Sequence, residues 1–316
     1  MFGVSSDKEI IMRGIYAVIS LMLLVITATS AMSAQSMTRS HKELPAIVLT
    51  AFGTSTKAKV TYDALDSQVK EALPGYEVRW AFTSEVIREI VNRRREKEGS
   101  PERLLSLQQV LANLQAEGYT RAAVQPLHIF PGEEYEEVLS ITESFPGITV
   151  LTGETLLQRW EMMHEVVAAI STDFLTPDEG CNVVVSHGTP TTNTASNMAY
   201  MGLDRYLKVK YDNVFLGGVE GVITREEALG AAKGCVPKRV RFIPLMYVAG
   251  DHIMNDIAGE VTVDELPWSA ELEEAGITTD TTTVDFGGKT FYKGLGFFPE
   301  VNKIFIDGIK KTLDRL

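Results

Sequence analysis

The strongest constraint on the fold is a pattern of short apolar segments and helical segments that occurs twice along the chain. The ends of three apolar segments correspond between the two halves: Phe52-Gly53-Thr54 with His187-Gly188-Thr189, Phe82-Thr83-Ser84-Glu85 with Gly218-Val219-Glu220, and Pro126-Leu127-His128 with Pro244-Leu245-Met246. Strands that alternate with helices predict parallel sheets built from right-handed βαβ units. The sequence therefore predicts an α/β fold of two similar lobes, each a four-stranded parallel sheet flanked by helices.

The predicted elements divide the chain into lobes. Strands are expected at 46–49, 77–82, 122–129 and 149–151 in the first lobe, and at 183–185, 214–216, 240–245 and 281–284 in the second. Helices are expected from the end of the first strand to about Leu73, over 101–117 and over 299–316, and the charged stretch 93–99 is expected to be a turn. We place the N-terminal lobe at 45–155 and the C-terminal lobe at 156–316.

Composition excludes several classes of protein. The 316 residues are 45% hydrophobic and 23% charged, which excludes a disordered chain. The net charge of -12 argues against a broad nucleic-acid-binding face, because phosphate contacts need concentrated cations. The two cysteines, Cys181 and Cys235, cannot form a zinc ribbon. Each precedes a predicted strand, so they form either one disulfide or two buried thiols.

The N-terminus resembles an export signal. Lys8 and Arg13 precede an apolar run at 15–26, and small residues follow it. The run is shorter than the about 20 residues that span a bilayer. We predict a signal peptide at 1–33, a polar tether at 34–44, and a periplasmic protein with no stable membrane span after cleavage. An uncleaved N-terminal anchor is the alternative.

Two histidines and a glutamate follow strands of the second lobe. His187, Glu220 and His252 come after the strands at 183–185, 214–216 and 240–245. Because ligands of parallel sheets bind beyond the carboxyl ends of the strands, we expect these side chains to meet and to bind a divalent metal. Asp256, four residues after His252, is the expected supporting carboxylate, and Asp251 is a weaker candidate. The alternative is that each histidine only satisfies a strand end.

Other polar residues are candidates for substrate binding. Gly53-Thr54-Ser55-Thr56 and Gly188-Thr189-Pro190-Thr191 are expected to open helices directly after strands, where free N–H groups and hydroxyls bind carboxylates or phosphates. Ordinary N-capping is the alternative. His128 either faces the crevice, as a substrate contact or as the ligand of a haem or second group, or is a rim histidine. His164, in a helical run, is expected to be structural.

Familiar nucleotide and nucleophile motifs are missing from the sequence. Residues 287–290 end like a phosphate loop, but Thr283 stands where that motif needs glycine. There is no G-x-S-x-G and no C-x-x-C. Of the reaction types considered, metal-centred chemistry without a nucleotide is the one that remains.

The chain resembles the anaerobic-type sirohydrochlorin cobaltochelatases, which are class II chelatases related in fold to ferrochelatase. The resemblance covers about 46–316, and its motifs are Phe52-Gly53-Thr54-Ser55, Ala81-Phe82-Thr83-Ser84, Leu127-His128-Ile129, His187-Gly188, Val219-Glu220 and Ala249-Gly250-Asp251-His252-x-x-Asn255-Asp256.

The resemblance implies a lyase that inserts Co²⁺, or Fe²⁺, into sirohydrochlorin without ATP, as in cobalamin biosynthesis or porphyrin biosynthesis. It places the family's metal-binding histidines on His187 and His252 and the acidic partner on Glu220. The resemblance implies that these groups ligate the metal and accept the pyrrole protons. The expected partners are the tetrapyrrole and further copies of the chain.

The predicted export signal departs from the family, whose members of cobalamin and sirohaem synthesis work in the cytoplasm. Two alternatives therefore stay open. One is an exported carrier of metal, haem or another tetrapyrrole without turnover. The other is a two-lobed solute-binding protein of the transport type. In that class the chain crosses twice between the lobes at a hinge, whereas this sequence indicates only one boundary between lobes.

Overall fold

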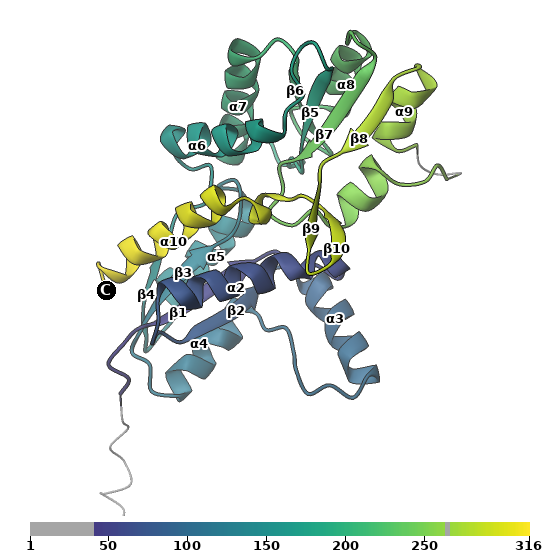
Figure 1. Ribbon diagram of the computed structural model, residues 1–316. Coiled ribbons are helices and arrows are strands. Elements are labelled where there is room, and N and C mark those ends of the chain that lie inside the picture. Colours follow the sequence, from purple (N-terminus) through teal and green to yellow (C-terminus); the bar gives the residue numbers. More distant parts are fainter. Residues whose placement is uncertain (1–40, 263–265) are drawn as a thin grey trace, which may run out of the picture. The chain divides into compact units, whose positions relative to one another are not determined.

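Two four-stranded parallel sheets organise the protein (Figure 1). The computed structural model describes residues 41–262 and 266–316. The predicted signal peptide and residues 34–40 of the tether lie outside this range. The described helices and strands belong to one unit, Lys42–Leu316.

The two sheets share one strand order. The first contains β1 (Ala46–Ala51), β2 (Val78–Phe82), β3 (Arg121–Pro126) and β4 (Thr149–Thr152), in the order β2-β1-β3-β4. The second contains β5 (Cys181–Ser186), β6 (Val214–Gly218), β7 (Arg239–Pro244) and β8 (Thr278–Thr281), in the order β6-β5-β7-β8. All these pairs are parallel. The predicted α/β fold with two similar sheets is confirmed.

The internal repeat extends to the residues that follow the strands. β3 and β7 both end in proline, and the next residue in each case is a leucine whose N–H bonds to the neighbouring inner strand, β1 or β5. The N–H of Leu127 donates to the Thr50 carbonyl at 2.8 Å, and that of Leu245 donates to the Val185 carbonyl at 2.7 Å. The two lobes therefore direct the chain out of the third strand in the same way.

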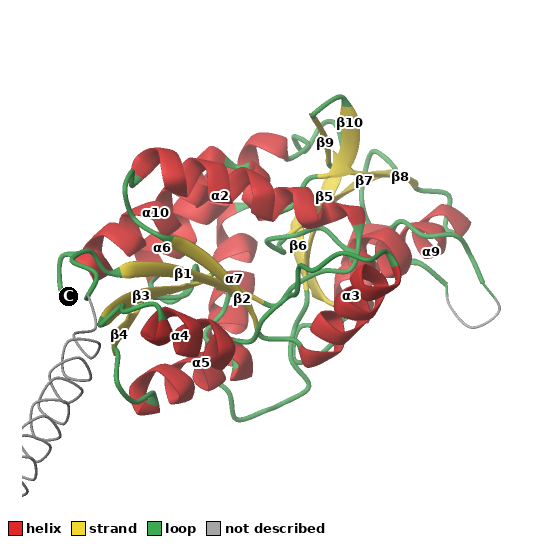
Figure 2. Ribbon diagram, turned by 90° about the horizontal axis from the view of Figure 1, so that it is seen from below, coloured by secondary structure: helices red, strands yellow, loops and turns green. Residues whose placement is uncertain are grey.

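Helices cover both faces of each sheet. The helices are α2 (Val60–Ala72), α3 (Glu85–Lys97), α4 (Leu107–Ala116), α5 (Glu133–Ser144), α6 (Trp160–Ile170), α7 (Ser196–Lys210), α8 (Arg225–Lys233), α9 (Trp268–Glu274) and α10 (Pro299–Leu313). On the first sheet, α4 and α5 cover one face, while α2 and α10 cover the other (Figure 2). On the second sheet, α8 and α9 cover one face and α6 and α7 the other. Among the described residues, no helix is both long and apolar enough to cross a bilayer.

One hydrophobic cluster includes residues of both sheets. Alternate residues of β1, Ile47 and Leu49, share it with Val184 of β5 and with Phe305 and Ile309 of α10. The last helix of the chain thus packs against the first lobe, next to β3 and α2. The boundary between 155 and 156 stays a prediction.

Several boundaries differ from those expected. The charged stretch expected as a turn continues α3 as far as Lys97, because its arginine, glutamate and lysine residues favour helix and Glu89 pairs with Arg93 at 3.0 Å. α4 begins at Leu107, after the capping residue Ser106. α7 begins at Ser196, so a loop rather than a helix follows His187.

The C-terminal region contains a hairpin that was not expected. β8 ends at Thr281, and β9 (Thr283–Phe286) and β10 (Lys289–Tyr292) form a separate antiparallel pair. Gly287 and Gly288 turn this hairpin with φ of 57° and 74°. The pattern expected to form the fourth strand is thus divided between β8 and β9.

The two cysteines form a disulfide. Cys181 opens β5, Cys235 precedes β7, and their Cα atoms are 6.0 Å apart. Of the two alternatives for these residues, two free thiols is therefore wrong. The bond lies at the opposite end of β5 from His187.

Candidate metal centre

The two predicted histidine ligands lie in contact. His187 directly follows β5, and His252 lies beyond the end of β7. Their ring centroids are 4.8 Å apart, with an interplanar angle of 78°. Residues separated by more than sixty positions in the sequence thus meet at one edge of the sheet, as the topology predicted.

Glu220 lies beside His187. One carboxylate oxygen, Oε1, is 3.4 Å from His187 Nδ1. The backbones continue the pairing of β5 with β6 past the sheet, because the Val219 N–H donates to Ser186 and the Glu220 N–H donates to His187, at 3.1 and 3.0 Å. The three predicted site residues are therefore close together.

Two glycines allow these loops to approach each other. Gly188 has a φ of 88°, and a Cβ there would lie 1.7 Å from the Glu220 carbonyl oxygen. Gly221 has a φ of 94°, and a Cβ there would lie 2.5 Å from the Thr189 carbonyl oxygen. Side chains at these two positions would push the Glu220 loop away from His187.

A carboxylate orients His252. Its Nδ1 is 2.6 Å from Asp256 Oδ2. A single π-helical turn, Ile253–Ile257, carries Asp256, a form that is frequent at functional sites. A proton on Nδ1 for this bond leaves the lone pair of Nε2 for a metal. Asp251 accepts a hydrogen bond from Asn255 instead, at 2.9 Å.

The Nδ1 atom of His187 also has neighbours, since it is 3.1 Å from the Gly188 carbonyl oxygen. The Nε2 atoms are thus the natural ligands of both rings. Glu220 lies at the Nδ1 side of His187, and no set of three His, Cys, Asp or Glu residues within 41–262 and 266–316 surrounds a single point. Glu220 would have to rotate to join the two imidazoles around an ion, and its side chain is 38% exposed.

The first glycine-threonine loop lies next to the segment that leads to His252. A Cβ on Gly250, two residues before His252, would lie 3.3 Å from Thr54 Oγ1. The loop hydroxyls serve local bonds: Thr54 Oγ1 accepts from the Thr56 N–H, and Thr56 Oγ1 accepts from the Ala58 N–H, each at 3.2 Å. In the second loop, Thr189 Oγ1 accepts from the Thr191 N–H at 3.3 Å. Thr56 caps the short helical turn that follows it, and the hydroxyls of Thr54 and Thr189 accept from N–H groups within their own loops. Substrate binding by the loops stays a prediction.

Two residues of this region have no signal in the sequence that marks them. Arg94 Nη1 donates to the Ser55 carbonyl at 3.0 Å, which places a cation at the first loop. The Tyr200 hydroxyl accepts a hydrogen bond from the Gly188 N–H at 3.0 Å. Arg94 lies in the stretch expected as a turn, so no helical face was assigned to it. Tyr200 lies within a helix, where sequence alone gives no signal of such a contact.

The remaining histidines differ in environment. His128 Nε2 is 3.5 Å from Thr83 Oγ1, while Nδ1 is buried without a hydrogen-bond partner among the described residues. Burial lowers the pKa of His128 to about 4, so the ring is neutral near pH 7. His164 is exposed on α6 and stacks on Tyr206, with ring centroids 4.5 Å apart. Its structural role stays a prediction.

Comparison with known proteins agrees with this architecture. SirB from Bacillus subtilis with Fe³⁺ has the same fold, with a TM-score of 0.56 and 14% identity over 85% of this chain and 96% of its own. A sirohydrochlorin cobaltochelatase of Salmonella typhimurium is 26% identical over 274 residues, 85% of this chain and 96% of that protein.

Sirohydrochlorin cobaltochelatase CbiKC of Nitratidesulfovibrio vulgaris is 32% identical over 239 residues, which cover 73% of this chain and 80% of that enzyme. The family described as Cobalt chelatase (CbiK) matches residues 45–314, nearly the whole unit described above. The chain therefore belongs to the CbiK cobalt chelatase family.

Proposed function

We propose that the protein inserts Co²⁺ into sirohydrochlorin without a nucleotide, and that His187, His252 and Glu220 handle the metal and the departing protons. The observation that carries the proposal is the contact of the two imidazoles, 4.8 Å between centroids, with an oxygen next to Nδ1 of each ring. The substrate comes from the names of the relatives, two of which are sirohydrochlorin cobaltochelatases.

The reaction explains the choice of residues. A divalent ion replaces the hydrogens of two pyrrole N–H groups, so two N–H bonds break, the metal binds the ring nitrogens, and two protons leave. No electron is transferred, and the balance requires no nucleotide. Neutral imidazole binds first-row divalent metals, and a carboxylate accepts protons near neutral pH. In this proposal the Nε2 atoms present Co²⁺ to the ring, and Glu220 passes protons to solvent.

The metal and the tetrapyrrole enter through an accessible edge of the sheet. The side chains of His187 and His252 are 49% and 38% exposed. We place the substrate carboxylates at the loops Gly53–Ser55 and Gly188–Thr189, with Arg94 as the neighbouring cation. Fe²⁺ is the second candidate metal, because the same ligand set suits several first-row ions.

We further propose that this reaction takes place in the periplasm. The predicted signal at 1–33 directs the chain there. The disulfide between Cys181 and Cys235 supports this location, because such bonds persist in oxidising compartments. An assembly of identical chains is part of the same expectation.

A second candidate function is an exported carrier of metal, haem or another tetrapyrrole. The buried Nδ1 of His128, which has no partner among the described residues, favours it, because a neutral imidazole is the form that ligates a metal. A carrier binds its ligand stoichiometrically and does not turn over. A tetrapyrrole absorption band in the purified protein that is lost in His128→Ala would favour the carrier.

The deciding experiment is an insertion assay. Purified protein is mixed with sirohydrochlorin and Co²⁺, and the tetrapyrrole absorption bands are followed over many equivalents of substrate. We expect multiple turnovers above the rate in buffer, and parallel reactions with Fe²⁺, Ni²⁺ and Zn²⁺ rank the metals. A folded protein that gives no acceleration with any of these metals would refute the proposed chelatase activity.

A further inference from the structure

A buried tyrosine bonds to the backbone beside His187. Tyr200 lies in α7 with 5% of its surface exposed. Its hydroxyl oxygen accepts the Gly188 N–H at 3.0 Å. Gly188 is the residue next to His187 and has the left-handed φ of 88°, so this bond stabilises a backbone conformation that determines where the imidazole points.

A residue of the first lobe packs against the ring of Tyr200. Phe130, in the loop that follows β3, stacks on Tyr200 with ring centroids 3.8 Å apart and an interplanar angle of 28°. The same loop touches the first turn of α7, because a Cβ on Gly132 would lie 3.6 Å from Ser196 Oγ. A continuous set of contacts therefore runs from the loop after β3, through Tyr200, to Gly188.

The Tyr200 hydroxyl is protonated near neutral pH. Burial is the main cause that raises its pKa, and the bond from Gly188 only partly offsets that effect. The neutral hydroxyl is therefore a fixed acceptor. Tyr206 lies on the same helix but has a different hydrogen-bond partner. Its hydroxyl accepts from the side chain of Lys210 at 3.0 Å on the exposed surface.

We infer that Tyr200 is a positioning residue of the metal centre: its hydroxyl holds the His187–Gly188 segment against the Glu220 loop, and Phe130 holds its ring. This inference rests on the proposed metal-binding role of His187. Removal of the hydroxyl leaves the Gly188 N–H without its acceptor while the aromatic stack remains. The effect then falls on the placement of His187 rather than on the core.

The test is Tyr200→Phe, with Tyr206→Phe as the matched control on the same helix. The loss of one hydrogen bond predicts that the Kd for Co²⁺, measured by calorimetry, rises about fivefold. We expect kcat/KM for insertion to fall by a similar factor and Tm to change little. Tyr206→Phe is expected to leave all three unchanged.

A double-mutant cycle separates positioning from general stability. In a His187→Ala background, Tyr200→Phe is expected to have no further effect on Co²⁺ affinity, because the ring that it positions is gone. Phe130→Leu keeps apolar volume but removes the aromatic stack, and it is expected to weaken Co²⁺ binding as Tyr200→Phe does. It replaces Tyr200→Phe in the test if that variant fails to fold.

The outcomes distinguish the inference from the proposed function. Wild-type protein that binds no Co²⁺ would contradict the proposed function itself. Wild-type protein that binds Co²⁺, with the same affinity in Tyr200→Phe and Phe130→Leu, would overturn only the role of Tyr200. An equal effect of Tyr200→Phe with and without His187 would also overturn it.

Discussion

At the scale of single residues, the proposed metal centre is expected to depend on a position that only glycine can occupy. The carbonyl of Glu220 lies where a Cβ of residue 188 would be, and the backbone there has a positive φ. His187 and Glu220 come from different strands, so their approach depends on this contact between loops. Glycine at 188 is therefore expected to be as necessary for the proposed metal centre as His187 and Glu220.

Gly188→Ala is expected to destroy the centre. The added methyl group meets backbone at 1.7 Å, so the loops must separate, and a positive φ costs a further about 1–2 kcal/mol for an L-residue. We expect loss of measurable Co²⁺ binding and a lower free energy of unfolding in denaturant. Gly230→Ala is the control, because a Cβ there meets no atom within 4 Å and the helix gains propensity. Normal Co²⁺ affinity in Gly188→Ala would show that the loops need not be close.

Residues at strand ends could be predicted, whereas residues that act through packing could not. His187, Glu220 and His252 follow apolar strands, and parallel topology requires such ends to share an edge. Asp256 followed from helical spacing. Tyr200 and Arg94 lie within helices. Their hydrogen-bond partners are backbone groups of loops, Gly188 for Tyr200 and Ser55 for Arg94. No periodicity in one sequence indicates such bonds.

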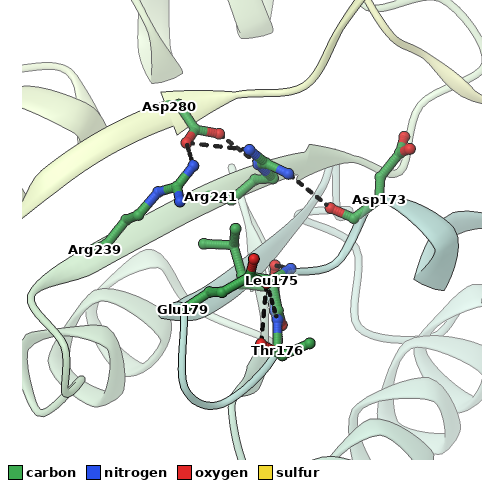
Figure 3. Close-up of polar contacts among 8 residues, drawn as sticks. Asp173, Leu175, Thr176, Glu179, Arg239, Arg241 and Asp280 are labelled. Atoms are coloured by element: carbon green, nitrogen blue, oxygen red, sulfur yellow. Dashed lines mark hydrogen bonds and ion pairs between the residues drawn. The ribbon is translucent and has the colours of Figure 1, made fainter.

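At the scale of elements, the second sheet is stabilised at the end opposite His187. The disulfide joins the start of β5 to the segment before β7. Figure 3 shows that Asp280 of β8 lies between two arginines of β7, with Arg239 Nη2 at 2.9 Å and Arg241 Nε at 2.5 Å. Arg241 also donates to the Asp173 carbonyl at 3.2 Å. These bonds connect β8, an edge strand, to the rest of the sheet.

Removal of the disulfide is expected to lower stability without affecting the metal centre. The bond closes a loop with a sequence separation of 54 residues. The double variant Cys181→Ala, Cys235→Ala is expected to lose about 2–4 kcal/mol of unfolding free energy, measured by denaturant titration. Co²⁺ affinity should stay within about twofold of the wild-type value, because mutations at distant sites act independently. Unchanged stability would mean that the bond is absent in solution.

The Asp280 cluster predicts a pH dependence. Burial raises the pKa of Asp280, but hydrogen bonds from Arg241 and Arg239 outweigh it and hold the pKa below its ordinary value. A pKa that is depressed in the folded state contributes stability above the unfolded value, about 3.9, and this contribution is lost as pH falls through the folded value.

Asp280→Asn is therefore expected to be less stable than wild type at pH 6, with a difference that shrinks below about pH 4. Unfolding free energies of both proteins, measured from pH 7 down to pH 3, test this expectation. Asp285→Asn in the hairpin is the control. A difference that is constant across the range would assign the effect of Asp280 to something other than its charge.

At the scale of the whole molecule, local sequence patterns predict the repeated βα units but not how distant segments pack together. Each βα unit has its own apolar period, so two parallel sheets followed from the sequence. The packing of α10 on the first sheet and the shared cluster of Ile47, Val184 and Phe305 depend on contacts between distant segments. The hairpin β9–β10 was missed because its strands are four residues each. So short a pattern is easily merged with the neighbouring strand.

The central claim is that two imidazoles from separate strands bind one divalent ion. The most direct test is Co²⁺ titration of wild type, His187→Ala, His252→Ala and the double variant by calorimetry, with His164→Ala as the control. We predict one Co²⁺ per chain in wild type and in the control, and loss of at least tenfold in affinity in each single variant. The double variant should bind little more weakly than either single variant, because each leaves the site incomplete. Wild-type Co²⁺ affinity in both single variants, with their folds intact, would contradict the account.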